Sequence, residues 1–199
     1  FGEGSPNDLN AMYDMQDEAR RMTTEALNAG AKLIVLPEGT NKLWSAGEAF
    51  YWGTVTDLAK EKDATVLLGV YTDMMEPDRV DGVGDLTTGE LYPAAIAVPF
   101  GMWAPWRERG NFPLHLGATR TISTSLGRAA YMVCYEELLP WPLAMQMTGD
   151  RPALVVSLAN QWFGEGWILR SQERGAELQA RLWGLPLLRA LNHAPLAFD

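Results

Sequence analysis

The sequence contains one cysteine and only two histidines in 199 residues. The single cysteine, Cys134, cannot form an internal disulfide. His115 and His193 lie too far apart in the sequence to suggest a metal-binding motif. We therefore expect no structural disulfide, no metal ion and no cofactor.

Positive charge is also scarce. The chain carries 16 Lys and Arg against 25 Asp and Glu, a net charge of −9, and its last lysine is Lys62. Nucleic-acid binding needs a basic face, and so does electrostatic docking to anionic lipid. The composition therefore argues against nucleic acid as a partner and against attachment to a membrane surface by charge.

No hydrophobic run is suited to span a membrane. The longest uncharged stretch, residues 91–106, is interrupted by Pro93, Pro99 and Pro105, which makes it a poor spanning helix. We also expect no signal peptide within these residues. Because the chain starts abruptly in a loop pattern and ends where a strand pattern begins, we expect a single domain, residues 1–199, that is a fragment of a longer protein.

Apolar runs and helical periodicities alternate along the chain. Helical patterns run from an N-cap at Asn7 or Asp8 to Gly30, and over residues 47–62, 136–147 and 165–183. Residues 76–90 and 99–118 are expected to be loops. This order is typical of an α/β fold whose sheet is covered by helices. Buried strands are predicted at residues 32–36 (stopped by Pro37), 64–71, 91–98, 127–133, 153–158 and 187–191.

Three of the expected strands end in polar residues that could carry chemistry. Glu38 follows the first, Cys134 the fourth, and Asn160 the fifth. Taken singly, each is more often structural: a solvated glutamate, a buried cysteine, a turn. Together they gather at the edge where open α/β sheets place their sites. A cysteine and a glutamate at this edge match the pairing of a nucleophile with its base.

Three sequence strings carry a family resemblance. LIVLPEGT, YMVCYEELLPW and SLANQWFG resemble the Glu, Cys and post-Cys motifs of the nitrilase (carbon–nitrogen hydrolase) superfamily. CYEE and QWFG are most similar to the apolipoprotein N-acyltransferase branch and to the related TraB-like conjugal-transfer proteins. Each string alone is weakly specific, but three in the family's order make a specific match.

The resemblance implies a four-layer αββα sandwich, incomplete at both ends, with a Glu–Lys–Cys triad. In that family the Glu takes the thiol proton, the Cys attacks an amide or ester carbonyl, and a thioester forms. Carried onto this chain, Glu38 is the base and Cys134 the nucleophile. The Tyr135 N–H is an oxyanion donor, and Glu136 is the acid that follows the cysteine. The residues expected around them in a pocket are Trp106, Asn160, Trp162 and Phe163.

The triad lysine of the family has no counterpart here. It lies in a stretch like K-x-x-L-V-P-F-G-E, which can be matched in two registers. In the first, residues 98–101 match and Ala94 fills the lysine slot. In the second, residues 112–113 match and Glu108 fills it. We favour the second register, because the first leaves the sheet short of a strand.

The missing lysine divides the functional hypotheses. We favour a nitrilase-like domain of a conjugal-transfer protein that has lost catalysis and binds a lipid, acyl group, peptide or partner protein. The pKa of Cys134 is then raised by apolar surroundings. The alternative is an active acyltransferase or amidase that forms a thioester on Cys134, with Arg107 or Arg109 as the oxyanion cation. A plain soluble amidase of the wider superfamily is a third hypothesis.

The resemblance also implies a location. The family branch is bacterial and anchored in the inner membrane, with this domain, itself soluble, on the periplasmic face.

Overall fold

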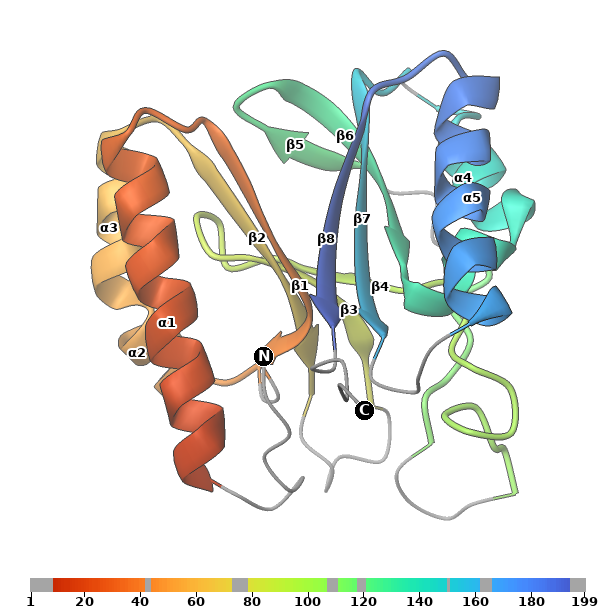
Figure 1. Cartoon of the computed structure of the whole chain (residues 1–199), viewed down its shortest axis with the longest axis horizontal. Coiled ribbons are helices and arrows are strands. Elements are labelled where there is room, and N and C mark those ends of the chain that lie inside the picture. The colour runs from red at the N-terminus through yellow and green to blue at the C-terminus, as the bar shows by residue number, and fades with distance from the viewer. Residues whose placement is uncertain are drawn as a thin grey trace.

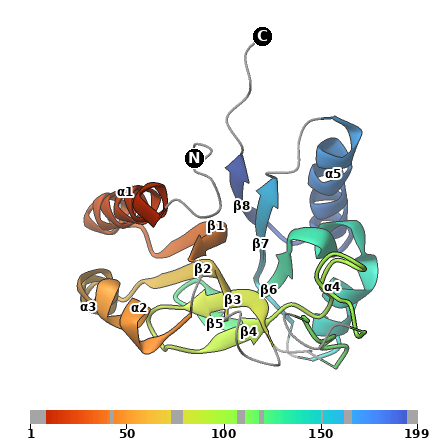
Figure 2. The ribbon, with the colours of Figure 1, turned by 90° about the horizontal axis from the view of Figure 1, so that it is seen from below.

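The chain folds into two four-stranded sheets with helices outside each of them (Figure 1). The computed structural model describes residues 9–41, 44–72, 79–106, 111–117, 121–149, 151–161 and 166–193. Seen from below, α1, α2 and α3 lie against one sheet, and α4 and α5 lie against the other (Figure 2). The layers are therefore helix, sheet, sheet and helix, as the resemblance implied.

The first half of the chain builds the first sheet and its helices. Its strand order is β1-β2-β3-β4, with β1 parallel to β2 and the following pairs antiparallel. The strands are β1 (Leu33–Asn41), β2 (Thr65–Tyr71), β3 (Asp81–Asp85) and β4 (Leu91–Pro93), and the helices are α1 (Leu9–Asn28), α2 (Ala46–Tyr51) and α3 (Gly53–Glu61).

The second half builds the second sheet in the order β5-β6-β7-β8, with the last three strands parallel. A short 3-10 helix, η1, follows β6 directly. The elements are β5 (Ile122–Thr124), β6 (Gly127–Val133), η1 (Cys134–Leu138), α4 (Pro140–Gln146), β7 (Leu154–Gln161), α5 (Trp167–Leu182) and β8 (Leu187–His193).

Apolar side chains fill the three spaces between the four layers. The central cluster joins the two sheets and includes Leu67, Val83, Tyr131 and Val156. A second cluster lies under α1 and α3, and a third lies under α4 and α5. Successive residues of a strand point to opposite faces, so strands buried on both faces read as continuous apolar runs.

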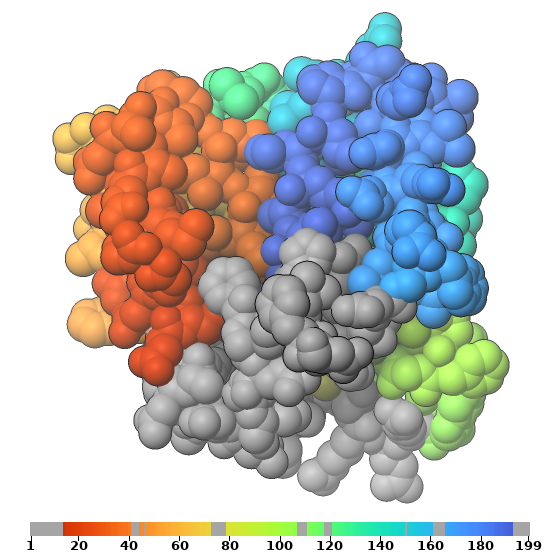
Figure 3. All heavy atoms as spheres, in the orientation of Figure 1, coloured from red at the N-terminus to blue at the C-terminus, as the bar shows by residue number. Residues whose placement is uncertain are grey.

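The two sheets meet along one edge. There β1 contacts β7 and β8, and β1 and β8 lie side by side on the face shown in Figure 3. Hydrogen bonds also cross between the sheets at the far end, where Ser125 after β5 bonds to Lys32 O and to Thr65 Oγ1. The first and second halves of the chain thus share one core.

Strand β1 differs from the prediction in a way that matters for the site. It does not stop at Pro37 but runs on to Asn41. Its register against β2 shifts between Leu36 and Asn41, so the residues between them bulge from the ladder. Proline is tolerated at such a bulge because it gives up no ladder hydrogen bond there. Glu38 therefore belongs to the strand itself.

Other boundaries also differ. The expected strand 91–98 ends at Pro93, and the expected loop 76–90 contains β3. The expected helix 47–62 is two helices that meet at Trp52. The helix expected over 136–147 is η1 followed by α4, because Pro140 starts a new helix at its first position. Strand β5 was not predicted. No helix of the described residues is long and apolar enough to cross a membrane.

Candidate active site

Glu38 is held at the inner edge of the first sheet by the bulge in β1. Its side chain is buried, and its backbone presses on the neighbouring strand at Gly69. A Cβ atom at Gly69 would lie 2.2 Å from Glu38 Cα, closer than any real contact. Glycine at this position of β2 is therefore what allows β1 to carry Glu38 inward.

Three neutral groups hold the Glu38 carboxylate. The Tyr71 hydroxyl donates to one oxygen at 2.5 Å, and the Asn160 N–H donates to the other at 2.9 Å. The Cys134 thiol also hydrogen-bonds to it. Burial raises the pKa of Glu38, and these three hydrogen bonds act in the opposite direction. The base expected from sequence thus contacts the expected nucleophile.

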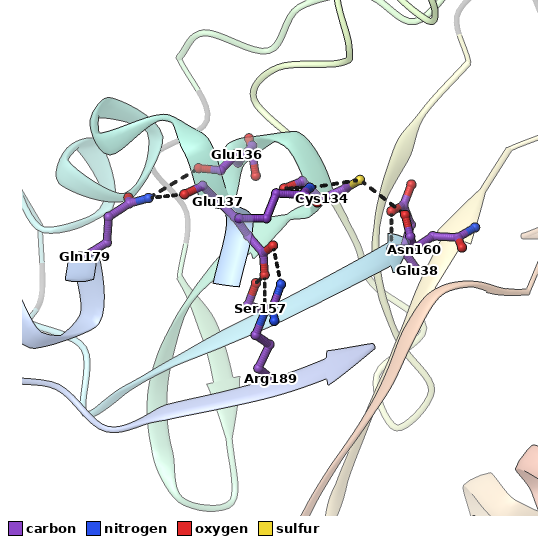
Figure 4. Close-up of polar contacts among 9 residues, drawn as sticks. Glu38, Cys134, Glu136, Glu137, Ser157, Asn160, Gln179 and Arg189 are labelled. Atoms are coloured by element: carbon purple, nitrogen blue, oxygen red, sulfur yellow. Dashed lines mark hydrogen bonds and ion pairs between the residues drawn. The ribbon is translucent and has the colours of Figure 1, made fainter. Parts of the chain in front are cut away.

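Cys134 occupies the abrupt turn between β6 and η1. Its φ is 45°, a left-handed conformation that is uncommon for a residue with a side chain. The thiol lies 4.0 Å from Asn160 O. Gln172 of α5 donates its amide to Cys134 O at 3.3 Å and to the sulfur at 3.9 Å. The turn aims the sulfur across the gap between the sheets, toward Glu38 (Figure 4).

The thiol is held in its neutral form. Burial raises the pKa of Cys134 above its ordinary value, and the negative charge and hydrogen bond of Glu38 raise it further. A raised pKa was predicted from sequence, and its direction is confirmed. The surroundings expected from sequence were apolar, whereas here part of the cause is a carboxylate.

Glu136 does not touch the sulfur. One of its oxygens accepts from the N–H groups of Ala95 and Ile96, at 2.6 and 3.2 Å, and the other accepts from Val133 N–H at 2.9 Å. Burial raises the pKa of Glu136 to about 7, against these amide hydrogen bonds. The carboxylate therefore ties the chain after β4 to the end of β6, and it positions the cysteine turn.

Glu137, the next residue, anchors the same turn to the second sheet. Arg189 of β8 grips its carboxylate with two bonds of 2.6 and 2.7 Å, and Ser157 of β7 donates at 2.7 Å. Gln179 of α5 donates to Glu137 O at 2.9 Å. In Figure 4 the Glu137 carboxylate points down to Ser157 and Arg189, whereas the Cys134 side chain points sideways, toward Glu38. Sequence reasoning missed this residue because a second Glu in CYEE also reads as a solvated helix residue.

Asp81 of β3 is another residue that sequence reasoning missed. It pairs with Tyr71 across β2 and β3, so both side chains lie on the inner face of the sheet. It is 6% exposed, and its Oδ1 has no hydrogen-bond partner. Burial, followed by the negative charges of Glu38 and Glu136, raises the pKa of Asp81 well above its ordinary value. A buried acceptor left unpaired costs about 1–3 kcal/mol.

Comparison with solved structures assigns the fold. The carbon–nitrogen hydrolase from Helicobacter pylori G27 superposes with a TM-score of 0.64 and 16% identity, covering 90% of this chain and 69% of that one. The C. elegans NitFhit protein gives a TM-score of 0.67 and 18% identity, covering 98% and 51%. An amidase from Nesterenkonia sp. AN1, described as a nitrilase-superfamily member, gives 0.59 and 16%, covering 90% and 71%. The chain has the nitrilase fold.

The relatives found by sequence are two conjugal-transfer proteins. The chain is 31% identical over 176 residues to the conjugal transfer protein TraB of Agrobacterium fabrum, covering 84% of this chain and 40% of the relative. It is 28% identical over 175 residues to the probable conjugal transfer protein TraB of Sinorhizobium fredii, covering 83% and 43%. The chain spans about two fifths of the length of these curated relatives. No protein-family model matches it.

Within this nitrilase fold, the lysine slot of the first register is well placed. Ala94 comes directly after β4, is buried, and shares a core cluster with Cys134. The sheet has its four strands with β4 at this place, and residues 99–106 and 111–117 contain no strand. The reason for preferring the second register is therefore lost. Glu108, the slot of that register, lies outside the described residues.

The other predicted site residues differ in where they lie. Asn160 is at the site, but its backbone makes the contacts with Glu38 and Cys134. Trp106 is 63% exposed and packs against Phe100 with tilted rings, whose centres are 5.9 Å apart, and no described hydrogen bond or ring contact joins it to Glu38 or Cys134. The Tyr135 N–H is in the first turn of η1, where N–H groups have no acceptor within the helix. Arg107, Arg109, Trp162 and Phe163 lie outside the described residues.

Proposed function

We propose that this chain is the nitrilase-like domain of a TraB-like conjugal-transfer protein, and that it binds a ligand at the Glu38–Cys134 site without amide turnover. The observation that carries the proposal is the charge around the thiol. Its described hydrogen-bond partners are Glu38, Asn160 O and the Gln172 amide. A thiol facing a carboxylate, with alanine in the lysine slot, lacks among the described residues the fixed cation that stabilises an oxyanion.

The charged groups around Cys134 explain why turnover is not expected. Attack on a carbonyl needs a thiolate, and the burial and carboxylate that raise the pKa of Cys134 work against it. The tetrahedral intermediate would then place a further negative charge near Glu38 and Asp81. Removing one oxyanion donor from an enzyme typically costs on the order of 10² to 10³ in rate.

A matched pair of assays tests the proposal. Purified protein and a Cys134→Ala variant are incubated with p-nitrophenyl butyrate and with acrylamide, and product is measured. We expect equal, background rates for both. In donor cells, transfer of the plasmid that carries the full-length gene should be unchanged by Cys134→Ala and lost when the domain is deleted. Turnover by the unaltered protein that disappears in Cys134→Ala would overturn the proposal.

Two observations favour a second function, acyl transfer through a thioester on Cys134. The thiol is hydrogen-bonded to Glu38, as a nucleophile is to its base, and its left-handed turn is the kind of strain found at active sites. Mass spectrometry after incubation with the ester distinguishes the two. An acyl adduct on Cys134 that forms in the unaltered protein and is absent in Glu38→Gln would support acyl transfer.

The wider setting is proposed from the family resemblance. We infer that the full-length protein is bacterial and anchored in the inner membrane, with this domain on its periplasmic face. The ligand is then an acyl, lipid or peptide group, or a segment of a partner protein.

A further inference from the structure

Asp81 stands in a row of side chains that crosses the inner face of the first sheet. Tyr71 pairs with Asp81, and Ala94 donates its N–H to Asp81 O at 2.8 Å, one residue beyond the pair of Gly82 with Pro93. Residues opposite one another in a sheet point to the same side. Tyr71, Asp81 and Ala94 therefore face the second sheet together, at the end of the sheet where Glu38 meets Cys134.

The row has acceptors but few donors. Tyr71 donates its hydroxyl hydrogen to Glu38. Ala94 offers only a methyl group, so the position next to Asp81 contributes neither charge nor a hydrogen-bond donor. Asp81 Oδ1 is left without a partner, although Asp81 is almost fully buried. A buried acceptor of this kind calls for a donor that the side chains of the row do not supply.

The charges around Asp81 identify the kind of donor. Glu38 and Glu136 both act on Asp81 with negative charge. Arg79, whose guanidinium lies 4.3 Å from the centre of the Phe112 ring, is the described residue that opposes them. When ionised, these carboxylates outnumber the one arginine that opposes them, so a bound positive charge would stabilise their ionised forms. A neutral donor would satisfy Oδ1 but not the negative charge, whereas a cation satisfies both.

We propose that Asp81 recognises a protonated primary amine of the ligand, which donates to Oδ1 beside Ala94 and lies next to Cys134. This inference rests on the proposed function, because it assigns the chemical class of the ligand that the Glu38–Cys134 site binds. An ammonium group fits because it has three donors and takes little space. Binding it requires no covalent step.

Thermal unfolding of the whole chain tests the proposal with propylammonium chloride as the probe. 1-Propanol is the neutral control, and potassium chloride matches the ionic strength. A compound that binds the folded state alone raises Tm with its concentration. We expect propylammonium to raise Tm in a saturable way and 1-propanol not to. Asp81→Asn should weaken the apparent affinity by about tenfold or more, as expected for loss of one partner of a buried charge pair.

Asp85→Asn is the matched control, because Asp85 is also buried and lies on the same face of β3, at its other end. It should keep the propylammonium response. If Asp81→Asn does not fold, Ala94→Lys replaces it: a tethered ammonium beside Asp81 should abolish the response. Equal stabilisation by 1-propanol, or a full response in Asp81→Asn, would overturn the inference. Neither result bears on turnover, so the proposed function would stand or fall separately on the Cys134→Ala comparison.

Discussion

Cys134 and Glu38 lie as a nucleophile and its base do, but the charges near them work against formation of the thiolate. Their contact is that of a nucleophile and its base, yet burial raises both pKa values and the carboxylate favours the neutral thiol. What the thiol can do therefore depends on whether a cation is present. A substitution that supplies one isolates this effect.

Ala94→Lys should lower the pKa of Cys134, because an ammonium near a thiolate stabilises the charged form. We expect alkylation of Cys134 by iodoacetamide at pH 7 to become faster, by about tenfold for each unit by which the pKa falls. Ala94→Met, of similar length but without charge, is the control for packing. If the Lys and Met variants react at the same rate, Ala94 is not at the lysine slot.

Glu136 makes stability depend on pH. Its pKa in the folded protein is about 7, above the ordinary 4.5, so between these values the folded state keeps a proton that the unfolded chain has released. The stabilisation is full below pH 4.5 and is lost as the pH rises toward 7. The gap corresponds to about 3 kcal/mol. Between pH 4.5 and 8, the unfolding free energy measured in urea should fall by about this amount more in the unaltered protein than in Glu136→Gln. Parallel pH profiles would contradict it.

Helix α5 supports the cysteine turn through one stripe of its surface. Gln172 binds Cys134, and Gln179 binds the carbonyl of Glu137. Gly175 lies between them, and a Cβ atom there would be 2.2 Å from Glu137 O. Residues three, four and seven apart share a helix face, so the stripe is a single docking surface for η1. Its central glycine sets how closely the two helices approach.

Gly175→Ala should therefore separate α5 from η1. We expect a loss of about 1–3 kcal/mol in unfolding free energy, as for overpacking, and faster alkylation of Cys134 because the turn loses its support. Gly53→Ala is the matched control, since Gly53 is also helical and a Cβ atom there would meet nothing within 4 Å. It should be neutral or stabilising by up to about 1 kcal/mol. Similar losses in both variants would mean that close packing at Gly175 is not the cause.

The elements predicted well from the sequence were those whose hydrophobic pattern has a single physical cause. Strands β2, β6 and β7 are runs of apolar residues because both faces are covered, whereas β8 was predicted from its apolar run although Leu188 is 40% exposed. Strand β3 was missed because its sequence, DGVGD, also fits a turn. Its glycines serve close approach instead: a Cβ atom at Gly82 would lie 2.3 Å from Tyr92 O, and one at Gly84 would lie 2.6 Å from the Trp44 ring. Neither neighbour is local in sequence, so no local pattern shows this.

At the scale of the molecule, the site lies where the two sheets face each other. Glu38 comes from the first sheet, and Cys134 follows a strand of the second. The motifs place both residues at strand ends, so their meeting was predictable. Asp81 and Gln172 were not, because their roles depend on pairing across β2 and β3 and on the docking of α5. Packing between the sheets should therefore affect the reactivity of the Cys134 thiol even where the packed residues do not contact it.

Leu67 and Leu68 separate that effect from general loss of stability. They are adjacent in β2 and equally buried, but Leu67 packs between the sheets and Leu68 packs under the outer helices. Leu67→Ala and Leu68→Ala should each cost about 2–5 kcal/mol. We expect faster alkylation of Cys134 in the first variant only, under conditions where both are folded. Equal acceleration in both would show that the thiol responds to global opening.

Each sheet is built from one contiguous half of the chain, and this has a practical consequence. Residues 9–94 supply Glu38, Tyr71, Asp81 and Ala94, whereas residues 122–193 supply Cys134, Asn160 and Gln172. A cut in the connection between them would leave each fragment with its own sheet, its own helices and half of the dyad. Such a pair would be a two-part reporter: the slow alkylation and raised pKa of Cys134 would return only when the fragments reassemble.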